Sequence, residues 1–336
     1  MSSIALANVQ SRTRELAPGF VVSLIVAAAA TFLSEHYGAP VMLFALLLGM
    51  SVNFLAGDGK CKAGIEFTAR NVLRIGVALL GMRITLEQIA ALGWKPFALV
   101  VIVVVATIGV SVIAARILGF KRIFGLLTGG ATAICGASAA LALAAALPNH
   151  PQKERATLFT VIGVSALSTL AMILYPMIAN WAALSPQEAG VFLGATIHDV
   201  AQVVGAGYSM STETGDTATV VKLMRVAMLV PVIVCAALVT RMQGADPTGK
   251  RPPLLPMFAV GFLILACVNS TGWVPALIQT GVNELSRWCL VIAISALGMK
   301  TQLKELAAVG IKPILLMIGE TVFLAALVLL LLHWSR

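Results

Sequence analysis

The sequence has few charged and few aromatic residues. Of its 336 residues, 11% are charged and 6% are aromatic, whereas 59% are hydrophobic and the mean hydropathy is +0.97. A soluble domain of ordinary composition has about 25% charged residues. The shortage of charge therefore excludes a soluble globular protein and predicts an integral membrane protein.

Several motifs of enzymes and metalloproteins are missing as well. The sequence has no P-loop, no dinucleotide-binding glycine pattern, no HExxH and no GxSxG. Its five cysteines show no CxxC or His-Cys metal spacing. We expect no cofactor, no structural metal and no enzymatic activity. An embedded enzyme that used Cys135 or His198 would need a positioned second partner, which the sequence does not indicate.

The net charge of +9 is spread over short loops and forms no basic tail or stripe, so nucleic-acid binding is not expected. The loops on the side of the N-terminus hold more Lys and Arg than the opposite loops. The positive-inside rule therefore makes the N-terminus cytoplasmic.

Apolar runs follow one another along almost the whole chain. Most have close to the roughly 20 residues that a helix needs to cross the hydrocarbon of a bilayer. They fall at about 19–34, 40–56, 67–82, 96–118, 123–147, 156–180, 189–208, 217–239, 255–273, 284–299 and 308–333. The pattern predicts an all-α polytopic membrane protein with about 11 membrane segments.

A duplicated stretch indicates how the halves are oriented. LGMRITLEQIAALGWKP at Leu80–Pro96 returns 217 positions later as LGMKTQLKELAAVGIKP at Leu297–Pro313, with nine identities. The distribution of charge places the first copy outside and the second inside. The chain is therefore predicted to contain an inverted-topology repeat, which is typical of transporters.

Glycine and polar residues interrupt two of the apolar segments, 123–147 and 189–208. The first contains TGGATAICGAS from Thr128, and the second contains GATIHDVAQVVGAG from Gly194. Irregular backbone at membrane depth is tolerated only where protein or a water-filled cavity surrounds it. Each segment is either a helix broken near the midplane or a re-entrant hairpin, and the hairpin alternative agrees better with the positive-inside rule.

The order of the segments predicts the domains. They are a cytoplasmic N-terminal segment (1–18), a peripheral first helix (19–39), outer scaffold helices (40–118), a core with both interrupted segments (122–240), and the inverted second copy of the outer helices (255–333). Movement of the core against the outer helices would give alternating access, as in an elevator-like transporter.

The interrupted segments are the expected binding site. A half-helix N-terminus has unpaired N–H groups and about half a positive charge, so two that face each other form an anion site. The alternative is that the glycines only allow close helix packing. The candidate substrate-binding residues in these segments are Thr128, Gly129, Gly130, Thr132, Cys135, Gly136, Ser138, Thr196 and His198.

Three ionisable residues are expected at membrane depth, where their cost indicates a function. We expect Asp199 to bind a proton during transport. Lys222 and Arg225 are three residues apart, hence on one helix face; Lys222 would pair with Asp199, and Arg225 would face an oxyanion. The alternative is a structural ion pair that holds the helices together.

These stretches, together with VVKLMRVAMLVP at 220–231, resemble the YeiH-like family of proposed sulfate exporters in bacterial inner membranes. The resemblance covers nearly the whole chain and implies paired broken helices and an elevator-like core. In the related cation/proton antiporters the second broken helix usually follows the second copy of the outer helices, so their ion-binding aspartates do not transfer directly. The resemblance implies that the site is lined by Thr132, Cys135, Gly136, Ser138, His198, Asp199, Gln202, Lys222 and Arg225.

The sequence predicts a secondary transporter that exports a small oxyanion (sulfate, sulfite or a sulfonate) coupled to a proton or sodium ion. The alternative is a monovalent cation/proton antiporter with Asp199 as its ion-binding carboxylate, although intramembrane cations outnumber acids. A non-transporting membrane scaffold would not need paired broken segments. The expected partners are the anion, the coupling ion, the lipid bilayer and a second copy in a homodimer.

Overall fold

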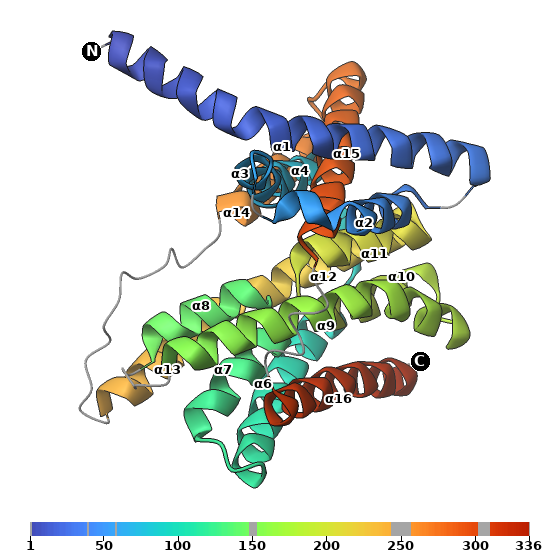
Figure 1. Cartoon of the computed structure of the whole chain (residues 1–336). Helices are drawn as coiled ribbons and strands as arrows, with labels where there is room; N and C mark the ends of the chain where they lie inside the picture. The colour runs from blue at the N-terminus through green and yellow to red at the C-terminus, as the bar shows by residue number, and fades with distance from the viewer. Residues whose placement is uncertain are drawn as a thin grey trace. The chain divides into compact units, whose positions relative to one another are not determined.

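The computed structural model describes residues 2–38, 40–57, 59–147, 153–242, 257–301 and 310–335. Every regular element in these ranges is a helix (Figure 1). A helix satisfies its own backbone N–H and C=O groups, which a segment surrounded by lipid must do. The all-α prediction is confirmed.

Six helices are long and apolar enough to cross a membrane, by length and composition. They are Arg12–Tyr37 within α1 (Ser2–Tyr37), α6 (Trp94–Ile117), α9 (Lys153–Trp181), Thr212–Ala236 across α12 and α13, α15 (Ala276–Lys300) and α16 (Ile311–Ser335). The other expected segments are formed by shorter helices. The structure therefore supports six membrane spans, and the larger number of about 11 membrane segments stays a prediction.

The chain divides into two compact units, and the first unit comprises residues 1–90 and 257–302. Besides α1 and α15, it contains α2 (Val41–Ser51), η1 (Asn53–Ala56), α3 (Lys62–Phe67), η2 (Thr68–Val72), α4 (Leu73–Leu79), η3 (Leu80–Met82), most of α5 (Leu86–Ala91) and α14 (Met257–Ser270). The expected segment at 67–82 is a helix whose winding changes twice, from the π-helix η2 through α4 to the 3-10 helix η3.

Two close helix contacts in the first unit repeat each other. Gly81 of η3 lies against α14, where a Cβ would be 3.1 Å from the nitrogen of Ala266. Gly298 of α15 lies against α2, where a Cβ would be 3.0 Å from the Cα of Gly49. Gly81 and Gly298 are 217 residues apart, as are Gly49 and Ala266. The sequence repeat thus corresponds to a repeated contact between small residues, which let helices approach closely. Residues 302–309 of the second sequence copy lie outside the described residues.

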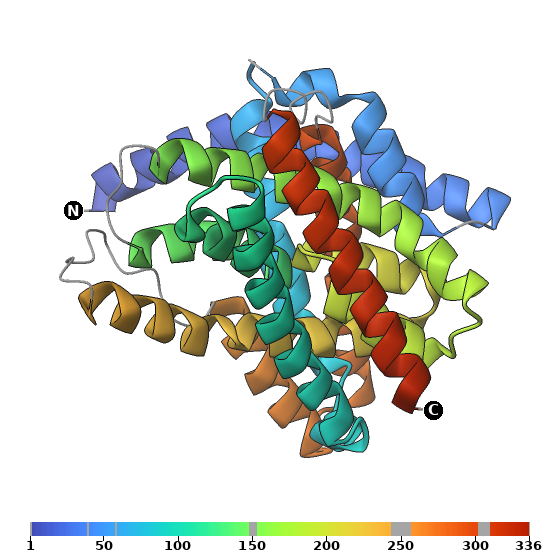
Figure 2. The ribbon, with the colours of Figure 1, turned by 90° about the horizontal axis from the view of Figure 1, so that it is seen from below.

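The second unit comprises residues 91–256 and 303–336 and includes both interrupted segments. Besides α6, α9 and α16, it contains α7 (Arg122–Ala133), α8 (Ala137–Ala146), α10 (Pro186–Thr196), α11 (Val200–Met210), α12 (Thr212–Ala227) and α13 (Leu229–Met242). Helices α6 and α16 pack against each other and against α7 (Figure 2). The sequence analysis grouped both with the outer helices, whereas their contacts are with the central ones. Which parts move during transport stays a prediction.

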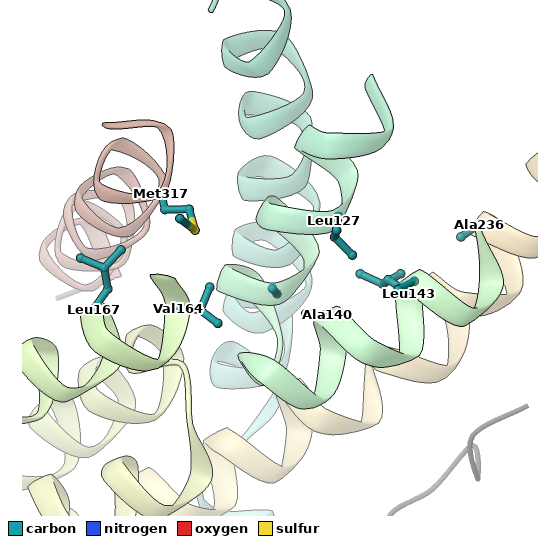
Figure 3. Close-up of a cluster of buried hydrophobic side chains, with 9 residues drawn as sticks. Leu127, Ala140, Leu143, Val164, Leu167, Ala236 and Met317 are labelled. Carbon is teal, nitrogen blue, oxygen red and sulfur yellow. The ribbon is translucent and has the colours of Figure 1, made fainter. Parts of the chain in front are cut away.

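A cluster of buried apolar side chains joins five helices of the second unit, α7, α8, α9, α13 and α16 (Figure 3). Its buried members are Leu127, Ala131, Ala140, Leu143, Ala144, Val164, Leu167, Ala236 and Met317. The end of the Met317 side chain lies where a Cβ on Gly163 would be. Because lipid tails are as apolar as these residues, close packing of this kind drives the association of helices in a membrane.

Gly298→Ala should lower the melting temperature of the purified protein. The new Cβ would meet the backbone of α2, which no side-chain rotation can relieve, so we expect a loss of about 1–3 kcal/mol. Gly281→Ala in the same helix is the matched control, since a Cβ there meets nothing within 4 Å and alanine favours the helix. Thermal unfolding in detergent, followed by tryptophan fluorescence, compares the two. Equal melting temperatures would contradict the close α2–α15 contact.

Candidate functional site

The first interrupted segment forms two helices, α7 and α8, separated by three residues. Helix α7 ends at Ala133 and α8 begins at Ala137. Gly136, in the break, has a φ of +63°, which a residue with a side chain rarely adopts. It is also the N-cap of α8 and provides no side-chain hydrogen bond to the N–H groups of the first turn. The positive end of α8 therefore has no cap from its own N-cap residue.

The second interrupted segment likewise forms two helices separated by three residues. Helix α10 ends at Thr196 and α11 begins at Val200. Asp199 is the N-cap of α11, and its Oδ1 accepts a hydrogen bond of 2.8 Å from the N–H of Ala201. Its own N–H donates to Oγ of Ser168 in α9 at 3.0 Å. A carboxylate is stabilised at this helix end by the helix dipole, and Asp199 is only partly buried.

The two breaks lie against each other. A Cβ on Gly136 would be 3.6 Å from the Cβ of His198. His198 is fully buried, and its Nε2 lies 3.0 Å from Oγ1 of Thr321 in α16. The structure thus brings the two interrupted segments and the middle of α16 together.

Two fully buried cations of α12 bind the backbone of both breaks. Nζ of Lys222 donates to the carbonyl oxygens of Ile134 and Ile197, at 2.7 and 2.8 Å. The guanidinium of Arg225 forms four hydrogen bonds of 2.8 to 3.1 Å, to the carbonyls of Thr132, Ala133, Gly194 and Ile197. These acceptors lie at the C-terminal ends of α7 and α10 and in the residues that follow them.

This position suits the two cations for electrostatic reasons. The last carbonyls of a helix have no partner within the helix, and the helix dipole makes that end negative. Lys222 and Arg225 supply both the missing donors and the opposite charge. From the sequence, Lys222 was expected to pair with Asp199 and Arg225 to face an anion. In the structure both hold backbone, while the pairing of Lys222 with Asp199 and the contact of Arg225 with an anion stay predictions.

Glu320 is a candidate that the sequence analysis missed. It lies in α16, is 2% exposed, and accepts hydrogen bonds from the hydroxyls of Ser111, Thr128 and Thr132. Thr128 and Thr132 were expected to bind substrate, but here they face this carboxylate. An acid inside the long apolar run at 308–333 was the signal, because such a residue is costly in a membrane.

Three further expected residues lie inside the helix packing. A Cβ on Gly129 would meet Ser111 of α6, and a Cβ on Gly130 would meet Leu143 of α8. These contacts agree with the alternative in which the glycines allow close packing. The buried hydroxyl of Thr196 donates to a carbonyl of its own helix at 2.6 Å.

The remaining candidates differ in exposure. Ser138 is exposed in the first turn of α8, whereas Cys135 is buried in the break before it. Gln202 is buried, and its Nε2 donates to Oγ1 of Thr169 at 2.8 Å, while that hydroxyl donates to a carbonyl of α9. Oε1 of Gln202 is then a buried acceptor without a partner among the residues that the structure describes.

The sequence matches one protein family and several curated proteins. Residues 18–317 match the family described as Conserved hypothetical protein 698. The UPF0324 membrane protein of Chlorobaculum tepidum is 57% identical over 314 residues, which are 93% of this chain and 88% of that protein. The UPF0324 membrane protein TauZ of Paracoccus denitrificans is 57% identical over 319 residues, 94% of each chain. A UPF0324 membrane protein of Caulobacter vibrioides is 37% identical over 314 residues, 93% of this chain and 67% of that protein.

Arg225→Leu should destabilise the purified protein strongly, because it leaves buried carbonyls of both breaks without a donor. We expect a loss of about 3 kcal/mol or more, and a smaller loss for Arg225→Lys, which keeps the charge but has fewer donors. Arg122→Leu, at the exposed start of α7, is the matched control. If Arg225 bound only the transported anion, Arg225→Leu would melt at the wild-type temperature in buffer without sulfate, sulfite or sulfonate.

Proposed function

The chain belongs to the family described as Conserved hypothetical protein 698, and from its site we propose that it is a secondary active transporter of a small oxyanion. The substrate in this proposal is sulfate, sulfite or a sulfonate, which leaves the cytoplasm in exchange or together with a proton or sodium ion. The protein is a membrane protein, as its relatives are. We place it in the bacterial inner membrane, with a cytoplasmic N-terminus and a second copy in a homodimer.

The pair of adjacent breaks held by two buried cations carries this proposal. Lys222 and Arg225 neutralise the negative ends of α7 and α10. The positive ends of α8 and α11 then face the same region, and α8 has no carboxylate at its N-cap. Asp199 caps α11, but the first turn of α8 has no N-cap side chain and carries the exposed hydroxyl of Ser138. N–H groups and a hydroxyl at a helix N-terminus are suitable ligands for an oxyanion.

Asp199 is the coupling residue in this proposal. Its partly exposed carboxylate lies at the second break, beside the break where the anion would bind. Like charges close together repel each other, so an ionised Asp199 would oppose anion binding. A proton or sodium ion on the carboxylate removes that repulsion, and this links the two binding events energetically.

Alternating access would come from movement of the core at 122–240, which carries both breaks, against the outer helices at 40–118 and 255–333. The repeated contacts of Gly81 with Ala266 and of Gly298 with Gly49 support an inverted-topology repeat in the first unit. In transporters built from such repeats, one part rocks or slides while the substrate stays at the broken helices.

A monovalent cation/proton antiporter is the second candidate. The oxygen atoms near the second break favour it, namely the carboxylate of Asp199 and the buried Oε1 of Gln202, which has no partner within the described ranges. Hard cations prefer oxygen ligands of this kind. In this alternative the ammonium of Lys222 competes with the cation for Asp199.

Liposomes that contain the purified protein should take up labelled sulfate or sulfite when a pH or sodium gradient is imposed. Ser138→Ala should raise the half-saturating anion concentration about fivefold, through the loss of one hydrogen bond of about 1 kcal/mol. Asp199→Asn should transport anion with a changed dependence on the gradient, since the residue no longer ionises. Glu284→Gln, at an exposed position of α15, is the control. Sodium/proton exchange without an effect of anion would favour the antiporter, and an absence of both fluxes would contradict a transporter.

A further inference from the structure

Glu320 is a buried carboxylate in the middle of a membrane-spanning helix. It is the tenth residue of α16, which runs from Ile311 to Ser335, and only 2% of it is exposed. An ionisable side chain at this depth is expensive and indicates a function. The anion site and the coupling residue proposed above leave Glu320 without a role.

Three neutral hydroxyl groups hold this carboxylate. Ser111 of α6 and Thr128 of α7 donate to Oε1, Thr128 at 2.7 Å, and Thr132 of α7 donates to Oε2 at 3.0 Å. Within the part of the chain that the structure describes, no Lys, Arg or His forms an ion pair with Glu320. Without a counter-charge, the ionised carboxylate is stabilised only by these neutral donors among the described residues.

The hydroxyl groups can satisfy Glu320 with or without a proton. Oγ of Ser111 also lies 2.6 Å from the carbonyl of Gly125, and Oγ1 of Thr128 lies 3.1 Å from that of Phe124. Each hydroxyl has one proton, which it donates either to the carboxylate or to its carbonyl. A protonated Glu320 can donate to Ser111, which then donates to Gly125. A change of charge in a protein interior usually costs free energy because it leaves a buried polar group without a partner. Ser111 and Thr128 avoid this cost in both protonation states of Glu320.

Glu320 is connected to both helix breaks. Thr132 binds Glu320 through its hydroxyl, and its carbonyl accepts the hydrogen bond of 2.8 Å from Arg225. Thr321, the next residue of α16, binds Nε2 of His198 at 3.0 Å. A change of charge at Glu320 therefore acts directly on Thr132 in the last turn of α7. The neighbouring residue Thr321 contacts the second break through His198.

Few other titratable or charged groups of the described residues lie near Glu320 on the helices that pack against α16. Helices α6 and α7 present the hydroxyls already described. Helix α9 contributes Tyr175, whose hydroxyl donates to the carbonyl of Thr321 at 3.4 Å. The break after α10 contributes His198, and Arg225 of α12 acts through Thr132.

We propose that Glu320 is a proton-binding site in the membrane interior and that its protonation controls the first helix break through Thr132. The carboxylate takes one proton from water, forming an O–H bond, and later returns it to water. A sodium ion fits less well, because it would have to separate carboxylate and hydroxyl oxygens that are already in hydrogen-bond contact. The use of this proton for coupling rests on the proposed transport function, whereas proton binding itself does not.

Infrared difference spectroscopy of the full-length purified protein tests proton binding directly. Spectra between low and high pH should show the C=O band of a protonated carboxyl that disappears as the pH rises. Because each of the 14 Asp and Glu residues contributes such a band at low pH, the Glu320 band is the part of the signal that Glu320→Gln lacks and that Asp199→Asn and the exposed control Glu284→Gln retain. An unchanged band in Glu320→Gln would overturn the proposal. So would a band that sodium chloride, but not choline chloride, removes at constant pH.

Thr128→Val keeps the carboxyl group and tests the site if Glu320→Gln does not fold. Removal of one donor to the ionised form makes proton binding tighter, so the band should persist to a pH about one unit higher, a tenfold change in affinity. An unchanged midpoint in a folded Thr128→Val protein would contradict the arrangement.

Transport assays separate this inference from the proposed function. If the Glu320 band titrates but liposomes show no anion flux, the proton site stands and the proposed function fails. If anion flux is present and its pH dependence is the same in Glu320→Gln and in wild type, the coupling role of Glu320 fails while transport stands.

Discussion

Two buried cations that bind backbone carbonyls are the interaction on which the second unit depends. A helix that stops inside a membrane leaves its last carbonyls without partners, and each unsatisfied group there costs several kcal/mol. Here two helices stop at the same place, and α12 supplies Lys222 and Arg225 to both. The carbonyls in turn make it tolerable to bury two positive charges. Neither the irregular backbone nor the cations would be stable in this environment alone.

The location of the breaks could be predicted from sequence, but their partners could not. Glycine and polar residues interrupt an apolar run in TGGATAICG and GATIHD, and the helices end within those motifs. Lys222, in contrast, binds Ile134 across 88 residues, and Thr128 binds Glu320 across 192. Contacts at such separations depend on how whole helices pack, which helical periodicity and charge distribution do not determine.

The grouping of helices shows a related limit of repeat analysis. A repeat identifies segments that resemble each other, and it was used to place 96–118 and 308–333 with the outer helices. Resemblance between two segments does not determine all the other segments that they contact. Helices α6 and α16 pack beside α7, and they bring Ser111 and Glu320 to its threonines. The carboxylate therefore comes from a part of the chain that the sequence had assigned to the scaffold.

The first unit consists of two stretches of chain, 1–90 and 257–302. The central helices of the second unit lie between these stretches in the sequence. Gly49 is synthesised 249 residues before Gly298, its partner. At about 5–20 residues per second, translation of that interval takes on the order of 10–50 s. Throughout this time the Gly49 face of α2 lacks the α15 surface that covers it in the folded protein. The first unit can therefore be completed only after α15, one of the last helices, has been made.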